Sequence, residues 1–302
     1  MEYPATLAEC HVGFIGAGNM AHAMATGFVK SGAIRADRLT ASAPSNRNLH
    51  KFTDLGCHVT NNSNALFAHL TPDARHRTLK VIFICVKPGV FTGAADDHPV
   101  IDLDQYEDER RLVVVSVMAG VKLATIRARL VDRLSFLPSG AVDLIRVMPN
   151  TACALNAGCC GVCTAPADAV SGRQRLDEFA GRLLAPLGTT EFVDERLLDA
   201  VCGLGGSGIA FVYTMIHAMA DGGLKMGLPR TVATNIATQT LLGAALMVQQ
   251  TGRNPIALRD EVTSPGGTTI HGLHALTAGG FDSAVMAAVE AATKRSQELS
   301  GP

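Results

Sequence analysis

A glycine-rich turn close to the N-terminus constrains the fold of this chain more than any other feature of the sequence. The apolar run 12–15 has the length of a strand, and a helix-like segment begins a few residues after it. Gly16, Gly18 and Ala21 match the G-x-G-x-x-A form of a dinucleotide-binding fingerprint. Such a turn offers the N–H groups of a helix start to a pyrophosphate, and a glycine turn without a ligand is the alternative. The predicted cofactor-binding residues of this turn are Gly16, Ala17, Gly18, Asn19 and Met20.

The order of apolar runs along the chain predicts the fold class. Further runs of strand length, at 39–43, 81–86, 112–117 and 144–148, alternate with helical periodicity. This alternation is typical of β-α-β units around a parallel sheet, and mainly helical patterns follow Asp194. We therefore expect an α/β chain with a Rossmann-type doubly wound sheet over residues 1–194 and an all-α domain over residues 195–302. The polar segments 69–80 and 93–111 are interpreted as inserted surface loops.

The end of the second predicted strand indicates which nicotinamide nucleotide binds. NAD sites usually carry an acidic residue there, about 20 residues after the glycine turn, which binds the ribose 2′-hydroxyl. Residues 40–47 contain no carboxylate. The side chains in this stretch that can donate hydrogen bonds to a 2′-phosphate are Ser42, Ser45, Asn46 and Arg47. We therefore expect NADPH to be the cofactor, with NADH binding more weakly.

Three later strand ends complete the predicted cofactor site, because strand ends in a doubly wound sheet face the ligand crevice. Val86, Lys87 and Pro88 follow one strand. Ala119 and Gly120 follow the next strand, on the side expected for the nicotinamide. Asn150 follows the strand after that, where it either orients the cofactor or only supports its loop.

A second glycine-rich run precedes a predicted helix at residues 267–277. The N–H groups and hydroxyls at such a helix start form a site for a small carboxylate, although an ordinary capped helix is the simpler alternative. The predicted substrate-binding residues are Ser264, Gly266, Gly267, Thr268 and Thr269. His271 and His274 share a helix face, but we interpret them as core or interface residues and expect no metal site.

Two long uncharged stretches, 200–220 and 231–252, predict how the chain assembles. Clustered glycines in the first and amide side chains in the second argue against membrane spans. A helix that is apolar on every face must be surrounded, and the other helices are too few to cover both. We therefore predict an intertwined homodimer, with a monomeric bundle as the alternative.

Charge and cysteine content exclude several other classes of protein. The 26 Lys and Arg residues balance 27 Asp and Glu residues, so nothing favours nucleic acid or an anionic membrane surface as a partner. We recognise no signal or transit peptide. The cysteines, Cys160 and Cys163 included, lack the spacing of a disulfide scaffold or a zinc site. We therefore expect buried thiols and a reducing, cytoplasmic location.

Taken together, these motifs resemble those of the Δ1-pyrroline-5-carboxylate reductase family over nearly the whole chain. The resemblance rests on residues 13–20, 86–88, 146–151 and 221–229, and above all on 262–276, in which the run 263–273 is close to the family's signature. It implies NAD(P)H-dependent reduction of a small molecule, pyrroline-5-carboxylate, to L-proline. It also implies a dimer with interleaved C-terminal helices, often built into larger rings such as a decamer of five dimers. The substrate carboxylate would lie on the helix start at 264–269, and Asn62 is the candidate for a contact with the cofactor ribose.

Thr269 is the candidate catalytic residue, because its hydroxyl can hydrogen-bond the imine nitrogen and place it for hydride transfer. The reaction further requires the two glycine-bounded helix starts to meet in one cleft, within one subunit or across a subunit contact. Two alternatives stay open: a different NADP-dependent dehydrogenase, such as a β-hydroxyacid dehydrogenase using Lys225, and an NADP-binding sensor without activity. Activity on related cyclic imines is left open as well.

Overall fold

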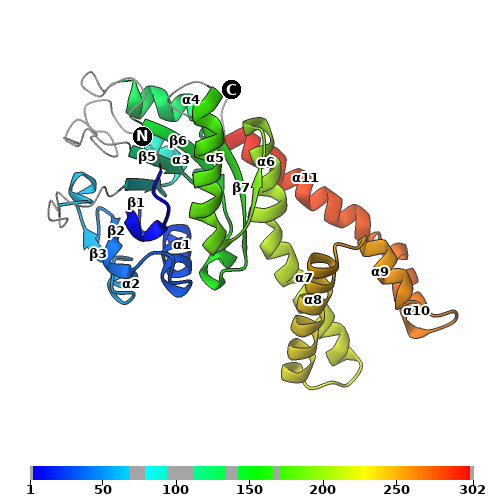
Figure 1. Cartoon of the computed structure of the whole chain (residues 1–302). Coiled ribbons are helices and arrows are strands. Elements are labelled where there is room, and N and C mark those ends of the chain that lie inside the picture. The colour runs from blue at the N-terminus through cyan, green and yellow to red at the C-terminus, as the bar shows by residue number, and fades with distance from the viewer. Residues whose placement is uncertain (1–2, 69–78, 94–111, 133–141, 166–169, 300–302) are drawn as a thin grey trace. The chain divides into compact units, whose positions relative to one another are not determined.

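The computed structural model describes residues 3–68, 79–93, 112–132, 142–165 and 170–299 (Figure 1). The chain divides into two compact units: Met1–Gly206 together with Thr293–Pro302, and Ser207–Ala292. The predicted boundary at residues 194 and 195 lies before this division, at the start of a helical segment that still belongs to the first unit. Most of the two segments interpreted as inserted loops, 69–78 and 94–111, lies outside the described residues.

The described residues of the first unit form an eight-stranded sheet with the order β3-β2-β1-β4-β5-β6-β7-β8. Its strands are β1 (Cys10–Ile15), β2 (Leu39–Ser42), β3 (His58–Thr60), β4 (Leu79–Ile84), β5 (Leu112–Ser116), β6 (Val142–Met148), β7 (Gly158–Ala165) and β8 (Gly188–Phe192). Neighbouring strands run parallel except β7, which is antiparallel to β6. The strand order reverses between β1 and β4, which makes the sheet doubly wound and confirms the predicted class.

The sequence analysis missed β3, and its residue pattern explains why. This strand has only three residues, and His58 and Val59 are exposed at the edge of the sheet. An edge strand of this kind has no continuous apolar run to reveal it. The central strands β1, β5 and β6 are buried along their whole length, as expected for strands covered by helices on both faces.

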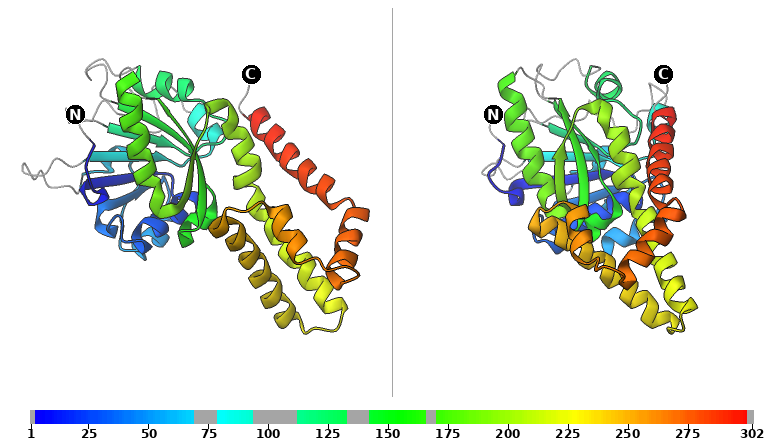
Figure 2. Two further views of the ribbon diagram at one scale, coloured as in Figure 1. Left: turned by 45° about the vertical axis from the view of Figure 1, so that its right-hand side comes forward. Right: turned by 90° about the vertical axis from the view of Figure 1, so that its right-hand side faces the viewer.

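Helices cover both faces of the sheet (Figures 1 and 2). One face packs against α1 (Asn19–Lys30), α2 (His50–Thr53) and α5 (Val170–Leu184), and the other against α3 (Pro88–Thr92), α4 (Leu123–Ile126) and α6 (Leu198–Val201). In the first core, Phe83 stacks on Phe14 and packs at a tilt against Phe28. Burying each large apolar side chain contributes about 1.5–3 kcal/mol, so these two layers hold the strand ends in place.

The second unit consists of helices, as expected from the helical patterns after Asp194. They are α7 (Gly208–Lys225), α8 (Arg230–Thr251), α9 (Pro255–Glu261), α10 (Thr268–Ala278) and the first part of α11 (Phe281–Leu299). Gly227 and Gly252 follow α7 and α8 with φ angles of 97° and 64°, the left-handed conformation that ends helices. Helices α7 and α8 pack closely through the small side chains Ala220, Ala233 and Ala237.

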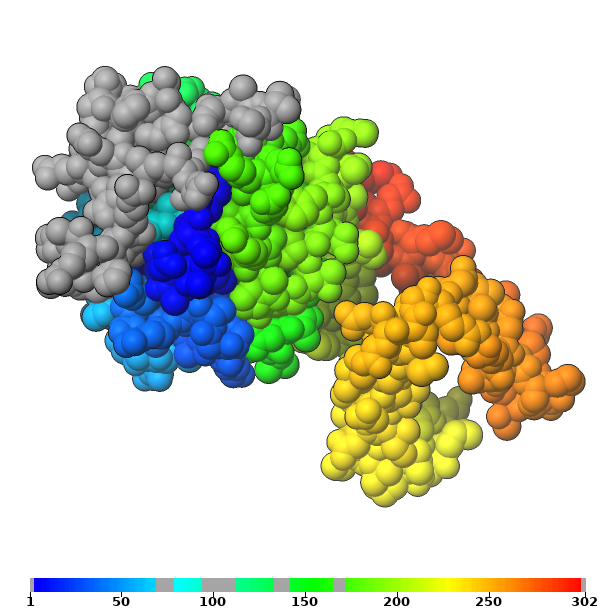
Figure 3. All heavy atoms as spheres, viewed as in Figure 1, coloured from blue at the N-terminus to red at the C-terminus, as the bar shows by residue number. Residues whose placement is uncertain are grey.

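Little of the apolar surface of the second unit is covered within it. Among its described residues, the three alanines between α7 and α8 are the buried apolar side chains. Ile236 and Met247 on α8 are 54% and 51% exposed, and Met286 on α11 is 64% exposed. The space-filling view shows α8 and the segment of α9 and α10 as largely separate masses (Figure 3). Two helical segments, 195–225 and 230–251, would also be long and apolar enough to cross a membrane.

Candidate active site

The turn after β1 has the geometry that its glycines predict. Gly16 has a φ of 99°, and a Cβ atom there would lie 2.9 Å from the carbonyl carbon and oxygen of Cys85. Its N–H donates to the backbone carbonyl oxygen of Ser42 at 2.8 Å, which connects the turn to β2. A Cβ atom on Gly18 would meet nothing within 4 Å. Gly16 is therefore needed for the turn itself, whereas Gly18 leaves open space in front of the backbone.

The first turn of α1 presents N–H groups beside that open space. Gly18 is the N-cap residue and forms no side-chain cap hydrogen bond, and the first helical bond runs from His22 N to Gly18 O at 3.0 Å. The N–H groups of Asn19, Met20 and Ala21 therefore have no acceptor inside the helix. The first turn contains no acidic residue. These groups fit a diphosphate, which supplies the acceptors and is favoured by the helix dipole.

The predicted 2′-phosphate residues lie in two different environments. Ser42 is buried, and its hydroxyl donates to Phe14 O at 3.3 Å and lies 3.1 Å from the Ser63 hydroxyl. This placement connects β2 to β1 through Phe14 and to the loop after β3 through Ser63. Ser45, Asn46 and Arg47 are exposed after β2.

Asn61, which the sequence analysis passed over for its neighbour, organises this exposed loop. Its Nδ2 donates to Asn46 Oδ1 at 2.9 Å and to Ala43 O at 3.0 Å. Asn62 is also exposed, but its Oδ1 accepts from Asn64 N at 3.0 Å and caps the short 3-10 turn Ser63–Ala65. The two neighbouring asparagines therefore have different hydrogen-bond partners within the fold.

The ends of β4 and β5 flank the glycine turn at the same edge of the sheet, because these strands are parallel to β1. Val86 is half-buried, Lys87 is the exposed N-cap residue of α3, and Pro88 is the first residue of that helix. Beyond β5, Ala119 is half-buried and Gly120 turns with a φ of 77°. The fold thus brings these predicted residues to the switch point of the sheet.

Asn150 is fully engaged in holding the protein together. Its Oδ1 accepts from Ala152 N at 3.2 Å and caps the turn Thr151–Leu155. Its Nδ2 donates to Gly205 O at 3.1 Å and to Cys159 Sγ at 3.2 Å. The sequence left two roles open for Asn150, orienting the cofactor or supporting its loop. These contacts favour the supporting role.

In the second unit, the predicted carboxylate site lies at the start of α10. Gly267 is the N-cap residue, without a side-chain cap hydrogen bond, and Gly266 turns with a φ of 65°. A Cβ atom on Gly267 would meet Ser264 Oγ, so a side chain at this position would displace the Ser264 hydroxyl. Ser264 and Thr268 are exposed, and Thr269 is half-buried. The first turn contains no acidic residue, so its free N–H groups fit a carboxylate.

The histidines and cysteines show structural contacts. His271 Nδ1 donates to Gly267 O at 2.9 Å, which ties that ring to the helix start. In the part of the chain that the structure describes, no three His, Cys, Asp or Glu side chains gather in a way that could hold a metal ion. Cys160 and Cys163 are buried in β7, as predicted for the CxxC pair. Burial raises the pKa of Cys10 to about 12 and that of Cys57 to about 11, so both remain protonated thiols.

A buried ion pair between Arg146 of β6 and Glu195 was not predicted from the sequence. Arg146 is only 2% exposed, and its Nη1 lies 3.1 Å from Glu195 Oε1. The same oxygen accepts from Leu123 N at 2.6 Å. An arginine inside the apolar strand at 144–148 is the signal that could have revealed it, because buried charges are normally paired.

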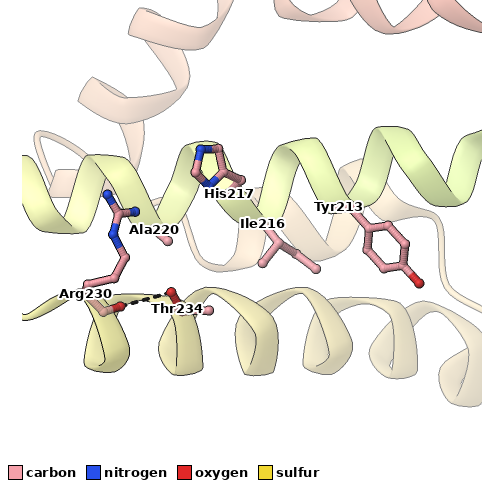
Figure 4. Close-up of a pocket in the computed structure, with 6 residues that line it drawn as sticks. All are labelled: Tyr213, Ile216, His217, Ala220, Arg230 and Thr234. Atoms are coloured by element: carbon pink, nitrogen blue, oxygen red, sulfur yellow. Dashed lines mark hydrogen bonds between the residues drawn. The ribbon is translucent and has the colours of Figure 1, made fainter.

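A shallow groove lies between α7 and α8, and none of the residues lining it was predicted as a site residue (Figure 4). Its lining residues are Tyr213, Ile216, His217, Ala220, Arg230 and Thr234. Arg230 forms an ion pair with Asp221, which also lies 3.3 Å from His217 Nε2. The hydrogen bond from Arg230 holds the pKa of Asp221 below its usual range.

The doubly wound sheet and its glycine turn define a dinucleotide-binding protein. Residues 11–120 match the family described as NADP oxidoreductase, coenzyme F420-dependent, and residues 195–299 match pyrroline-5-carboxylate reductase dimerisation. Pyrroline-5-carboxylate reductase 3 of Danio rerio is 39% identical over 295 residues, which cover 96% of this chain and 92% of that protein. The chain therefore belongs to the pyrroline-5-carboxylate reductase family, and it is an NAD(P)H-dependent oxidoreductase.

Further relatives agree with this assignment. Pyrroline-5-carboxylate reductase of Arabidopsis thaliana is 39% identical over 291 residues, covering 96% of this chain and 95% of that protein. The Coxiella burnetii reductase structure superimposes with a TM-score of 0.76 at 26% identity, covering 97% of this chain and 99% of that one. The Plasmodium falciparum reductase, solved with NADP bound, superimposes with a TM-score of 0.74 at 26% identity, covering 96% and 98%.

Proposed function

We propose that this chain reduces Δ1-pyrroline-5-carboxylate to L-proline and prefers NADPH to NADH. The observation that carries the proposal is the open N-terminus of α1 behind Gly16 and Gly18, in a member of this reductase family. The related reductase of Plasmodium falciparum was solved with NADP bound, which supports the choice of cofactor.

The N–H groups of Asn19 and Met20 would bind the diphosphate of the cofactor. Ser45, Asn46 and Arg47 are exposed after β2, where a cationic guanidinium and neutral donors favour a 2′-phosphate over a free hydroxyl. Arg47 has no hydrogen-bond or ion-pair partner among the described residues, so its charge is available to a ligand. When bound, the nicotinamide supplies the hydride.

The start of α10 would bind the substrate carboxylate. Its N–H groups and the hydroxyls of Ser264 and Thr268 can donate to the two carboxylate oxygens, with Gly266 and Gly267 allowing close approach. Holding the carboxylate fixes the ring of the substrate, because the carboxylate is attached to the same small ring that contains the reacting carbon. This orientation is the main contribution that the protein makes to the rate.

Reduction transfers a hydride to the C=N carbon of the protonated ring, and the nitrogen keeps its proton and becomes a secondary amine. The protonated C=N group is already a good hydride acceptor, so the protein needs to place it and does not need a strong acid. The Thr269 hydroxyl would hydrogen-bond the ring nitrogen and fix its position. Losing one such bond typically costs about 100-fold in rate.

We propose further that two copies of the chain form a homodimer through the second unit. Exposed side chains such as Ile236, Met247 and Met286 would leave a large apolar surface in water if the chain stayed alone. The match of residues 195–299 to the dimerisation family supports a second copy as the cover. Burial in this dimer interface would also explain why two helical segments are apolar, without requiring that they cross a membrane. Rings such as a decamer of five dimers would build on this dimer.

A cytoplasmic location completes the proposal. All eight cysteines are free in the structure, which suits a reducing compartment. Cell fractionation with an antibody against the chain tests the location directly, and recovery of the protein in a membrane or organelle fraction would refute it.

The test of the activity is the loss of NADPH absorbance in the presence of pyrroline-5-carboxylate. We expect turnover by the wild type, a loss of about 100-fold in kcat for Thr269→Val, and full activity for Thr277→Val at the other end of α10. Thr269→Val that folds and dimerises with wild-type turnover would refute the role of the hydroxyl. Turnover of a β-hydroxyacid instead of the imine would favour the dehydrogenase alternative, and tight NADPH binding without any turnover would favour a sensor.

A further inference from the structure

A buried guanidinium lies within β6, at a place where the proposed mechanism uses no charge. Arg146 is 2% exposed, while its partner Glu195 is 30% exposed. The Nε and Nη2 atoms of Arg146 are buried without a hydrogen-bond partner among the described residues. Within the described part of the chain, the Glu195 carboxylate balances this buried charge, with Arg146 Nη1 3.1 Å from Glu195 Oε1. A buried charge with a single counter-ion holds that counter-ion firmly in place.

Glu195 uses the same oxygen to bind the backbone of another element. Oε1 accepts from Leu123 N at 2.6 Å, and Leu123 is the first residue of α4. The N-cap residue of this helix, Lys122, makes no side-chain cap hydrogen bond. The carboxylate therefore replaces the missing local cap, and its negative charge suits the N-terminus of a helix. This cap comes from a residue 72 positions further along the chain.

Residues 117–122 form the loop that leads to this cap. This loop contains Ala119 and Gly120, which are predicted to lie on the nicotinamide side of the cofactor. Its start is held by hydrogen bonds from Val117 N to Ile84 O at 3.1 Å and from Met118 N to Ser116 Oγ at 3.3 Å. Gly120 then reverses the backbone with a φ of 77°. The other end is held by Glu195. The position of the loop is thus fixed at both ends, and the second attachment depends on a side chain from a distant element.

We propose that Glu195 is a positioning residue: its Oε1 caps α4 at Leu123 and so holds the backbone of Ala119 and Gly120 at the nicotinamide side of the cofactor crevice. Glu195 does not touch the reacting atoms and acts through the loop, and Arg146 balances its charge. Glu195 is also the first residue of the segment that matches the dimerisation family, although it belongs to the first compact unit. The inference rests on the proposed function only in assuming that this loop contacts the nicotinamide.

Two double variants separate the cap from the buried charge. Changing one partner alone leaves a charge buried or a pair broken, which destabilises the fold for an unrelated reason. Arg146→Met with Glu195→Gln removes both charges and keeps an acceptor for Leu123 N. Arg146→Met with Glu195→Met removes both charges and the acceptor, at similar volume. The exposed pair of Asp194 and Arg196, 3.6 Å apart, supplies the control variant Asp194→Asn.

The variants are compared as full-length protein by three measurements: kcat with pyrroline-5-carboxylate, the NADPH Kd from fluorescence titration, and hydrogen exchange of the Leu123 amide. We expect the Gln double variant and Asp194→Asn to stay within about twofold of wild type. We expect the Met double variant to lose about tenfold in kcat, with an unchanged Kd and faster exchange at Leu123, because a displaced loop misplaces the nicotinamide while the diphosphate site stays intact.

Wild-type kcat and exchange in the Met double variant would overturn the proposal, and so would equal losses in both double variants. If the Met double variant does not fold, Glu195→Asp serves in its place, since it keeps the charge but withdraws the oxygen from Leu123; wild-type behaviour of that variant would likewise refute the role. Exchange and NADPH affinity are measured without substrate. An inactive wild type would therefore refute the proposed function, while the exchange data would still decide whether Glu195 holds the loop.

Discussion

Gly16 and Gly18 are separated by one residue, yet the structure places them in different surroundings. Gly16 needs a positive φ and has the backbone of Cys85 against it, whereas Gly18 has an extended conformation and open space beside it. The fingerprint read from the sequence treats both as glycine positions. The structure distinguishes a glycine required for folding of the turn from one required for the approach of a ligand.

Alanine at these two positions is therefore expected to give different results. Gly16→Ala should lower the free energy of unfolding by about 1–3 kcal/mol, because the turn must shift and φ is strained. Gly18→Ala should leave stability unchanged and weaken NADPH binding by about tenfold or more, because the new methyl group occupies the space for the diphosphate. Chemical denaturation and fluorescence titration check both. Equal stability losses in the two variants would contradict this distinction.

Arg47 is the residue on which the cofactor preference should depend most. Its guanidinium is exposed beside Ser45 and Asn46 and has no partner among the described residues. Arg47→Ala should lower kcat/KM for NADPH by about tenfold and leave kcat/KM for NADH nearly unchanged, since only NADPH carries the 2′-phosphate. Lys30→Ala, at the far end of α1, is the control. A similar loss with both cofactors would show that Arg47 does not read the phosphate.

At the scale of one element, α1 joins the phosphate-binding turn to the core of the first unit. Met24, Ala25 and Phe28 are buried against the sheet, and a Cβ atom on Gly27 would lie 2.3 Å from Cys153 O. Packing therefore fixes the helix, and the helix in turn fixes the N–H groups at its start. The position of the phosphate-binding turn is therefore set by core residues that lie away from the cofactor site.

One histidine of α1 predicts how stability depends on pH. The ring of His22 lies against Phe52, with 5.7 Å between ring centroids, and burial lowers its pKa below 6.5, with the Lys51 charge a second cause. The folded protein thus binds this proton less readily than the unfolded chain. Stability contributed by neutral His22 is complete above the unfolded value of 6.5 and is lost as pH falls through the lower folded pKa.

His22→Gln should therefore flatten the decline in the free energy of unfolding that begins as the pH falls below 6.5. Denaturant titrations at several pH values check this, with the exposed His58→Gln as the control. A decline in His22→Gln as steep as that of wild type would show that other groups determine the acid sensitivity.

At the scale of the whole molecule, the second unit is the part in which a single chain leaves large apolar side chains exposed. Its buried apolar side chains among the described residues are three alanines, while Ile236 and Met247 lie on one exposed face of α8. Burial of such a face at a second copy gains about 25 cal/mol per Å2 of apolar surface removed from water. The free energy of dimer formation and the fold of this unit are therefore expected to depend on each other.

Ile236→Lys should convert the dimer into a monomer, because a charge would have to be buried in the interface without a partner. Light scattering after size exclusion checks the mass, and Gln249→Lys, on the opposite side of α8, is the control. We expect the monomeric variant to lose most of its activity while the first unit still binds NADPH. A fully active variant that remains dimeric would refute the interface assignment.

The sequence by itself determined the features that depend on local patterns. The glycine turn, the alternation of strands and helices, and helix ends such as Gly227 and Gly252 follow from short-range geometry and periodicity, so they can be read from neighbouring residues. Strand β3 shows the limit of local patterns, because a three-residue edge strand with two exposed residues has no apolar periodicity.

Only the tertiary structure decided which polar groups remain available to a ligand. Ser42 and Asn150 have the chemistry of binding residues, yet their hydrogen bonds are used within the fold. Glu195, which carries no motif, reaches residues 49 and 72 positions away in the chain and holds a loop of the cofactor crevice. Contacts at that separation are set by the packing of elements and not by sequence spacing, which is the physical reason that the sequence alone could not reveal them.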